Sequence, residues 1–173
     1  ISSTNADQQY YHAPASYGNR AIVVWESRDN GVNEDIRGRL IDMATGKPIG
    51  TKDFLISTSN SEIQKSPSVA VSGYHALIIW CSRNNGINYD IRGRLMNIST
   101  GEFISNNDFL ISSSNIGDQV NPKVIVSQNT AMVVWQSLDN PLNSYDIRGR
   151  LINMSDGSFA DTGDFLVSTT NAS

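Results

Sequence analysis

The hexapeptide DIRGRL occurs three times, at residues 35–40, 90–95 and 146–151. Two other segments recur with it: AIVVWES, ALIIWCS and AMVVWQS begin at 21, 76 and 131, and DFLIST, DFLISS and DFLVST begin at 53, 108 and 164. A repeat of about 55 residues indicates an architecture built from one recurring unit. We therefore expect a single repeat domain over 1–173, with units at about 8–62, 63–117 and 118–173 and a leader, 1–7, that resembles the end of a preceding unit.

Each unit contains four short segments with strand patterns. In the second unit, residues 66–73 alternate between apolar and polar, 76–80 are all apolar, 90–98 alternate again and 108–112 end the unit. An entirely apolar second strand indicates burial on both faces, and connections rich in Gly, Asn and Ser indicate turns. The predicted fold is all-β, with three four-stranded antiparallel repeats that resemble β-propeller blades. A β-trefoil, which also has three four-stranded repeats, is the alternative.

Within the hexapeptide, side chains alternate between the two faces of the strand. In the second unit this places Ile91 and Gly93 on one face and Arg92 and Arg94 on the other. A glycine in a strand leaves space for a bulky neighbour, and Trp80 is the expected one.

The first strand of the first unit, over residues 9–18, departs from the repeat. His12 stands where the second unit has Pro67, and Pro14 stands where it has Val69. Because proline cannot donate a hydrogen bond to a sheet, this strand is expected to be an edge strand or locally irregular, and a place where another chain can meet this one. An enzyme, the third class of function, would require a mixed-residue pocket outside the repeated residues, and this strand is the only place where we would look for it.

The stretch NPKVIVSQNTAMVVWQSLDNPLNSYDIRGRLINMSDG (121–157), followed by DFLVSTTN (164–171), resembles the tandem repeats of large microbial surface and secreted proteins. Those repeats are similar to β-propeller blades and serve as scaffolds, adhesive modules and sugar-binding modules. Ser27, Asp29 and Gly31 loosely resemble the Asp-box of sialidases and related propellers, which stabilises a hairpin turn and takes no part in catalysis. The resemblance implies an extracellular or cell-surface location.

Two kinds of repeated side chain are candidates for ligand binding. A guanidinium matches the carboxylate of an acidic sugar, so the first arginine of each hexapeptide is a candidate: Arg37, Arg92 and Arg148. The alternative is that these arginines pair with the repeated acids Asp53, Asp108 and Asp164, or with Asp35, Asp90 and Asp146, and tie strands or blades together. Tyr89 and Tyr145, which precede the hexapeptide, are candidates for stacking on sugars, whereas Trp25, Trp80 and Trp135 end apolar strands and are expected in the core.

The hairpin before each hexapeptide carries oxygen ligands at regular spacing: Asp29, Asn33, Asp35, Asn84, Asn88, Asp90, Asp139, Asn143 and Asp146. Hard oxygen donors close in sequence suit calcium. The alternative is that these side chains shape the hairpin as Asx-turns without any metal. No cofactor is expected, and calcium is the one candidate ion.

Three Asn-x-Ser sequons mark candidate glycosylation sites if the chain is secreted: Asn97, Asn153 and Asn171. Cys81 is the only cysteine, so an intrachain disulfide is impossible, and its apolar strand predicts a buried thiol.

Composition excludes two kinds of partner. The net charge is −4 and the arginines are spread through the repeats, so we expect no nucleic-acid binding. No apolar stretch approaches the roughly 18–20 residues that span a bilayer, so we expect no membrane insertion.

Function follows from the repetition itself. Catalysis normally needs different groups that converge on one substrate atom, so threefold repeated residues are poor candidates for a catalytic centre. The sequence predicts a non-catalytic extracellular repeat module for surface structure, self-assembly or adhesion by multivalent display, with copies of itself or neighbouring repeats as partner. Because propellers use about four to eight blades, three units leave three possibilities open: two chains that make a six-bladed ring, a segment of a longer array or filament, or the β-trefoil. The alternative is a lectin with equivalent glycan sites in the repeats.

Overall fold

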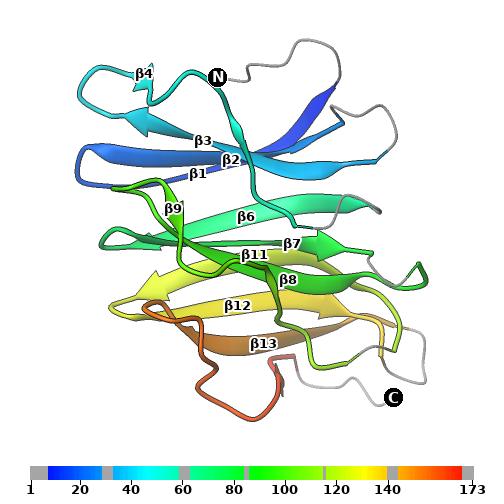
Figure 1. Ribbon diagram of the computed structural model, residues 1–173. Coiled ribbons are helices and arrows are strands. Elements are labelled where there is room, and N and C mark those ends of the chain that lie inside the picture. The colour runs from blue at the N-terminus through cyan, green and yellow to red at the C-terminus, as the bar shows by residue number, and fades with distance from the viewer. Residues whose placement is uncertain are drawn as a thin grey trace.

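The computed structural model describes residues 8–28, 33–58, 63–83, 86–114, 116–139 and 144–168. Its strands form three antiparallel sheets that lie one beside the next, in chain order (Figure 1). Four candidate residues lie outside the described part: Asp29, Asn84, Asn143 and Asn171.

Each repeat forms one sheet, which we call a blade. Blade 1 contains β1 (Gln9–Tyr17), β2 (Arg20–Ser27), β3 (Asp35–Asp42), β4 (Lys47–Pro48) and β5 (Phe54–Leu55). Blade 2 contains β6 (Gln64–Ser72), β7 (His75–Ser82), β8 (Asp90–Asn97), β9 (Glu102–Phe103) and β10 (Phe109–Leu110). Blade 3 contains β11 (Gln119–Ser127), β12 (Thr130–Ser137), β13 (Asp146–Asn153) and β14 (Phe165–Leu166).

The all-β prediction is confirmed, as is the prediction of blade-like repeats. The first three strands of each blade pair in order, and the short β5, β10 and β14 pair with β3, β8 and β13. Because every repeat forms its own sheet, the β-trefoil alternative is wrong. The two-residue strands β4 and β9, which also pair with the third strand of their blades, carry too weak a pattern to be predicted from the sequence.

The first strand of every blade is a sheet edge and contains an irregularity. The pairing register shifts between Tyr10 and Ala13 in β1, and at the equivalent places in β6 and β11. The prediction that the first strand is an irregular edge strand is therefore confirmed. The irregularity is shared by all three blades, although only the first carries the unusual His12 and Pro14.

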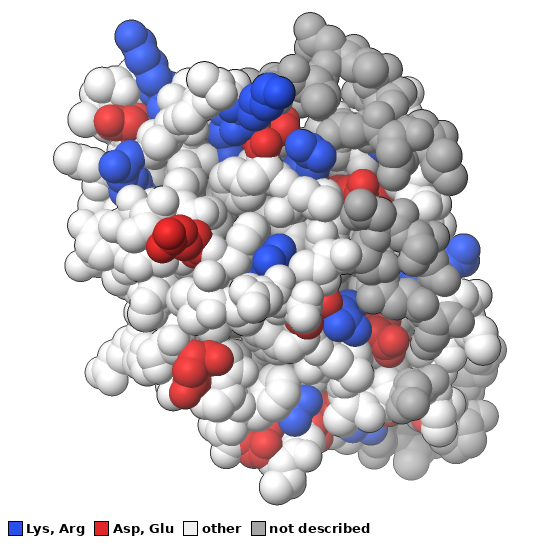
Figure 2. Space-filling view, in the orientation of Figure 1, with Lys and Arg blue, Asp and Glu red and all other residues white. Residues whose placement is uncertain are grey.

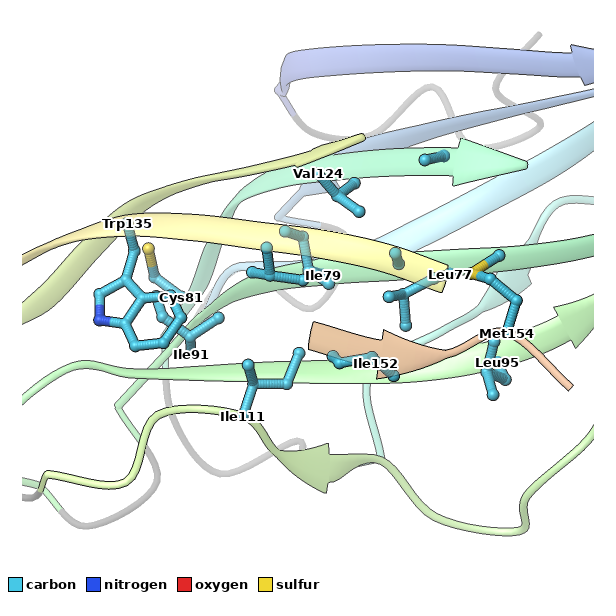
Figure 3. Close-up of a cluster of buried hydrophobic side chains, with 13 residues drawn as sticks. Leu77, Ile79, Cys81, Ile91, Leu95, Ile111, Val124, Trp135, Ile152 and Met154 are labelled. Carbon is cyan, nitrogen blue, oxygen red and sulfur yellow. The ribbon is translucent and has the colours of Figure 1, made fainter. Parts of the chain in front are cut away.

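Two apolar clusters hold the blades together, one between each neighbouring pair. The cluster between blades 1 and 2 includes Ile22, Val24, Ile36, Leu40, Ile56, Ala76, Ile78, Trp80, Met96 and Ile98. The cluster between blades 2 and 3 includes Leu77, Ile79, Cys81, Ile91, Leu95, Ile111, Ala131, Val133, Trp135, Ile152 and Met154 (Figure 3). Blade 2 thus buries both faces of its second strand, as predicted.

Three expectations about the core can now be judged. Trp25, Trp80 and Trp135 are all buried, which confirms their core position. Cys81 is buried as predicted, and that burial raises the pKa of its thiol to about 12. The expected contact between Gly93 and Trp80 is wrong, because Gly93 pairs with Ile79 and a Cβ placed on it would lie 2.7 Å from Cδ1 of Ile111.

Acidic and basic side chains are interspersed on the face shown in Figure 2, without a large area of one sign. In the described part of the chain there is no helix of the length and hydrophobicity needed to cross a membrane.

Candidate functional site

The irregularities of the three first strands lie next to one another. β6 packs between β1 and β11, so the three edge strands form the meeting line of the blades. At the shift in each strand one residue adopts a left-handed backbone, with φ of 44° at Tyr11, 56° at Ser66 and 55° at Asn121. Such φ values are uncommon for residues other than glycine, and β-bulges of this kind redirect side chains at functional sites.

A cavity of about 280 Å³ opens at these bulges. Each blade contributes three consecutive residues to its lining: Tyr11, His12 and Ala13; Ser66, Pro67 and Ser68; Asn121, Pro122 and Lys123. The cavity therefore occupies a repeated position of the fold but presents a different set of groups from each repeat.

The lining combines an apolar floor with polar groups. Pro67 and Pro122 are buried, whereas Tyr11, His12 and Lys123 are exposed, with 69% of Tyr11 accessible to solvent. The lining thus combines a phenol, an imidazole, two hydroxyls, an amide and an ammonium with two buried prolines. None of the nine lining residues is a carboxylate. This arrangement can donate and accept hydrogen bonds and offers one aromatic face for stacking.

The bulges of blades 2 and 3 are each held by the preceding blade. The backbone N–H of Ser66 donates to Oε2 of Glu26 at 3.2 Å, and the backbone of Asn121 hydrogen-bonds to Cys81, which occupies the equivalent position of blade 2. Burial raises the pKa of Glu26, against the opposing effect of the Ser66 hydrogen bond. The cavity shape therefore depends on contacts between blades.

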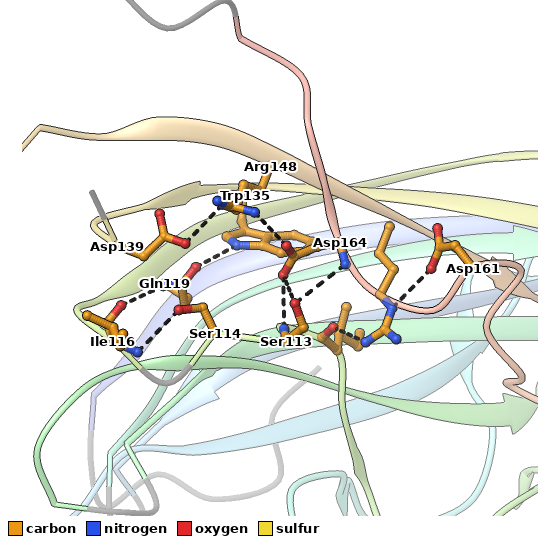
Figure 4. Close-up of polar contacts among 11 residues, drawn as sticks. Ser113, Ser114, Ile116, Gln119, Trp135, Asp139, Arg148, Asp161 and Asp164 are labelled. Carbon is orange, nitrogen blue, oxygen red and sulfur yellow. Dashed lines mark hydrogen bonds and ion pairs between the residues drawn. The ribbon is translucent and has the colours of Figure 1, made fainter. Parts of the chain in front are cut away.

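The first arginine of each hexapeptide forms an ion pair inside its own blade. Arg37 pairs with Asp53 at 3.0 Å, Arg92 with Asp108 at 2.7 Å and Arg148 with Asp164 at 2.7 Å. Arg148 also lies 3.1 Å from Asp139 (Figure 4). The structural alternative for these arginines is confirmed, with Asp53, Asp108 and Asp164 as the partners. Their binding to acidic sugars stays a prediction.

Two of these aspartates, Asp108 and Asp164, also join neighbouring blades. Oδ2 of Asp108 accepts from the backbone N–H and the hydroxyl of Thr58 in blade 1, at 3.0 and 2.6 Å. Asp164 accepts in the same way from Ser113 of blade 2, at 2.9 and 2.6 Å (Figure 4). Burial alone would raise the pKa of Asp108, but the Thr58 hydrogen bonds and the Arg92 charge outweigh it and lower that pKa.

Neither of the two candidate tyrosines lines the cavity. Tyr89 is half-buried against the cluster between blades 2 and 3, and Nζ of Lys65 lies 4.0 Å from its ring centroid. Tyr145 holds the equivalent position in blade 3 and is 50% exposed. The structure therefore places them in successive blades, and stacking on a sugar stays a prediction for both.

The candidate calcium ligands that the structure describes are Asn33, Asp35, Asn88, Asp90, Asp139 and Asp146. Burial raises the pKa of Asp90, and Asp139 pairs with Arg148. No group of three or more His, Cys, Asp or Glu side chains is arranged for a metal ion within the described ranges. Calcium binding by the hairpins stays a prediction.

The two described sequon asparagines shape turns. Oδ1 of Asn97 accepts from the backbone N–H of Ser99 at 2.9 Å, and Oδ1 of Asn153 accepts from that of Ser155 at 3.0 Å. Asp42 does the same for Ala44 in blade 1. The repetition of this position is thus explained by an Asx-turn, and glycosylation stays a prediction.

The sequence pointed to strand 9–18 as the place for a mixed pocket but missed the cavity residues of the other two blades. The signal was a dipeptide at one repeat position: Tyr11-His12, Ser66-Pro67 and Asn121-Pro122. The first residue of each dipeptide adopts a left-handed backbone, and a pattern in a single sequence does not reveal that conformation.

The sequence matches no protein-family model and no curated protein. Solved β-propeller glycoside hydrolases resemble the fold at low sequence identity. An α-L-arabinofuranosidase from Lactobacillus brevis matches with a TM-score of 0.64 and 12% identity over 98% of this chain and 60% of that one. The family 117 glycoside hydrolase Zg3597 of Zobellia galactanivorans gives 0.63 and 9% over 92% and 55%. An endo-arabinase from Bacteroides thetaiotaomicron gives 0.61 and 14% over 98% and 66%.

These similarities show the fold: three antiparallel sheets, each built on four repeated strands, that match the blades of β-propeller glycosidases. The chain spans between 55% and 66% of the length of these three enzymes. It is thus similar to part of a propeller, in the fold that these carbohydrate-active enzymes share.

Proposed function

We propose that the chain is a non-catalytic, extracellular carbohydrate-binding module that takes one sugar ring in the cavity at the three bulges. The observation that carries this proposal is the lining, in which nine residues from three blades combine an exposed tyrosine, a lysine, hydroxyls and an amide over buried prolines. A sugar presents an apolar ring face and a rim of hydroxyls, and this combination of groups suits both.

The chemistry of the lining favours binding over hydrolysis. Most glycoside hydrolases use a pair of Asp or Glu side chains on either side of the scissile bond. No carboxylate lines the cavity, and Glu26, which contacts the cavity residue Ser66, is buried and engaged with its backbone. Lys123 adds a positive charge, which favours an acidic sugar over a neutral one.

Titration by isothermal calorimetry tests the proposal, with N-acetylneuraminic acid as the acidic sugar and L-arabinose as the neutral one. We expect a dissociation constant on the order of 1 mM for the acidic sugar and weaker binding of arabinose, as for one small shallow site. Tyr11→Ala and Lys123→Ala should each weaken binding about tenfold. Tyr17→Ala removes an exposed tyrosine of the same strand outside the cavity and serves as the matched control.

Equal binding by Tyr11→Ala, Lys123→Ala and the wild type would reject the cavity as the site. Absence of heat with both sugars at concentrations of about 10 mM would reject the carbohydrate class.

A second function, multivalent display for surface structure or adhesion, is supported by the repetition itself. The turns capped by Asp42, Asn97 and Asn153 have the same hydrogen bonds in all three blades. A fixed array of equal turns strengthens weak contacts through their effective concentration. The test is to immobilise the chain and to apply either a multivalent glycan surface or the monovalent sugar. Retention of the multivalent surface without retention of the monovalent sugar supports display.

A further inference from the structure

Blade 2 holds two cationic side chains against one tyrosine ring. Nζ of Lys65 lies 4.0 Å from the ring centroid of Tyr89, and Cζ of Arg83 lies 5.7 Å from the same centroid. All three side chains are half-buried, so each is partly open to solvent. The quadrupole of an aromatic ring attracts a cation over its face, which places both charges here without neutralising either.

The other two blades do not repeat this arrangement. In blade 1, Arg28 stands at the position of Arg83 and pairs with Glu34, which stands at the position of Tyr89. In blade 3, the position of Arg83 holds Leu138. Blade 2 therefore has the arginine of blade 1 but an aromatic ring in place of the carboxylate that pairs with it.

The guanidinium of Arg83 lacks a hydrogen-bond partner within the described ranges. Its Nε is buried and unpaired, which is also true of Nε in Arg94. The terminal nitrogens of Arg94, however, donate to the carbonyls of Ile56 and Asn106, at 2.8 and 2.7 Å. For Arg83, no side-chain hydrogen bond joins it to another described residue. Such a group is uncommon in folded proteins, and a bound ion or water is one way to satisfy it.

The acids near this cluster are engaged elsewhere. Oδ1 of Asp118 accepts from the backbone N–H of Tyr89 at 3.0 Å, and Glu26, whose charge also attracts Lys65, accepts from a backbone N–H of the adjoining bulge. Neither Lys65 nor Arg83 forms an ion pair with a carboxylate in the described part of the chain. Burial alone would lower the pKa of Lys65, but its contact with the Tyr89 side chain outweighs burial and raises that pKa. Both cations are therefore charged at neutral pH and available to an anion.

The cluster adjoins the sugar cavity. Lys65 directly precedes Ser66, which lines the cavity, and it pairs across the sheet with Cys81. Cys81 in turn hydrogen-bonds to the backbone of Asn121, another lining residue. Because Lys65 itself is not part of the lining, the cluster is a neighbour of the cavity and not a portion of it.

We propose that Lys65, Arg83 and Tyr89 form a subsite for the acidic group of a second sugar unit, so that the ligand is an anionic oligosaccharide rather than a single sugar. A carboxylate or a sulfate accepts charge-assisted hydrogen bonds from an ammonium and from the terminal nitrogens of a guanidinium. The exposed part of the tyrosine ring offers apolar contact to the sugar that carries this group. The inference rests on the proposed function, because the first sugar unit occupies the cavity.

Isothermal calorimetry with galacturonic acid, trigalacturonic acid and the fully methyl-esterified trimer tests the subsite. The ester has the same length as the acidic trimer but no charge. We expect the acidic trimer to bind about tenfold more tightly than the monosaccharide, and the ester to gain little over it. Sodium chloride at about 0.5 M should weaken binding of the acidic trimer more than that of the ester. A sulfated galactose disaccharide, compared with the acidic trimer, shows whether the subsite prefers a sulfate or a carboxylate.

Variants locate the gain. Arg83→Gln and Lys65→Gln should each remove most of it, so that the acidic trimer binds about as the monosaccharide does. Arg28→Gln changes the equivalent arginine of blade 1, which is paired with Glu34, and is the matched control. It should bind the acidic trimer like the wild type.

The NMR signal of the Arg83 Nε–H group, assigned by its loss in Arg83→Gln, reports on the subsite directly. It should shift when the acidic trimer is added and stay in place with the ester. Equal affinity of the wild type for the two trimers, or an Arg83 signal that the acidic trimer does not move, overturns the subsite.

The cavity and the subsite can fail separately. If Tyr11→Ala binds the acidic trimer like the wild type while Arg83→Gln loses the gain, the cavity proposal fails and the anionic subsite stands. If Tyr11→Ala weakens binding while Arg83→Gln binds like the wild type, the cavity stands and the subsite is overturned.

Discussion

The interface between blades 2 and 3 and the open face of blade 3 are built from the same positions of the repeat but differ in exposure. Ile111 is fully buried in the first, and Val167, its equivalent, is 46% exposed in the second. Phe109 is half-buried and makes an edge contact with Phe159, whereas the equivalent Phe165 is 38% exposed. The strands themselves pair in the same register in both blades.

The difference shows that on this face of the repeat, burial comes from the neighbouring blade rather than from the sheet. Blades 2 and 3 pair their strands alike, but Ile111 is covered by the next blade and Val167 is not. Matched substitutions at equivalent positions should therefore have unequal effects on stability while the chain is a monomer.

Truncation of the equivalent aliphatic residues should give the largest contrast. Ile111→Ala removes a fully buried side chain and should lower the free energy of unfolding by about 2–5 kcal/mol. Val167→Ala removes a half-exposed side chain and should cost less than about 1 kcal/mol in the monomer. Urea unfolding at low protein concentration measures both, and equal losses would contradict the comparison.

Removal of the interblade carboxylate should have the next largest effect. Asp108→Asn loses the charge that accepts hydrogen bonds from Thr58 and pairs with Arg92, and should cost about 1.5–3 kcal/mol at pH 7.

The pH dependence of that loss follows from the lowered pKa of Asp108. A carboxyl with a lowered pKa in the folded state contributes stability above its unfolded pKa, about 3.9, and loses it as the pH falls through the folded value. The difference between wild type and variant should therefore shrink below about pH 4. A difference that stays constant down to about pH 2 would show that Asp108 acts by shape alone.

The glycine of the hexapeptide should give the smallest contrast. A Cβ at Gly93 would lie 2.7 Å from Cδ1 of buried Ile111 and 3.3 Å from the Ile78 carbonyl, so Gly93→Ala should cost about 1 kcal/mol or more. At Gly149 the nearest atoms belong to Phe165 and Val167 on the open face, at 3.1 to 3.2 Å, and these side chains can move. Gly149→Ala should change the thermal midpoint little, and a loss equal to that of Gly93→Ala would argue against an open face.

Much of the fold was predictable because its signals are local and repeated. The apolar runs that begin at 21, 76 and 131 predicted the second strands and the burial of the tryptophans. The alternation in DIRGRL predicted the third strands and placed Ile91 and Arg92 on opposite faces. The partner of Gly93 was wrong because it depends on which residue of the short fourth strand folds back onto it. That contact, with Ile111, is made across 18 residues of chain.

The candidate site was less predictable because it forms from three separated segments. No pattern in the sequence shows that Ser66 and Asn121 adopt a left-handed backbone beside Tyr11, since a single sequence does not show which first strands lie side by side. The repeated arginines attracted attention as ligand groups because a sequence shows charge without showing its partner. The structure supplies that partner in Asp53, Asp108 and Asp164.

Thermal unfolding of Ile111→Ala and Val167→Ala under identical conditions tests most directly that a neighbouring blade, and not the sheet itself, buries this position of the repeat. Ile111→Ala should lower the midpoint by several degrees, and Val167→Ala should lower it little. Equal shifts of the two midpoints would contradict the account.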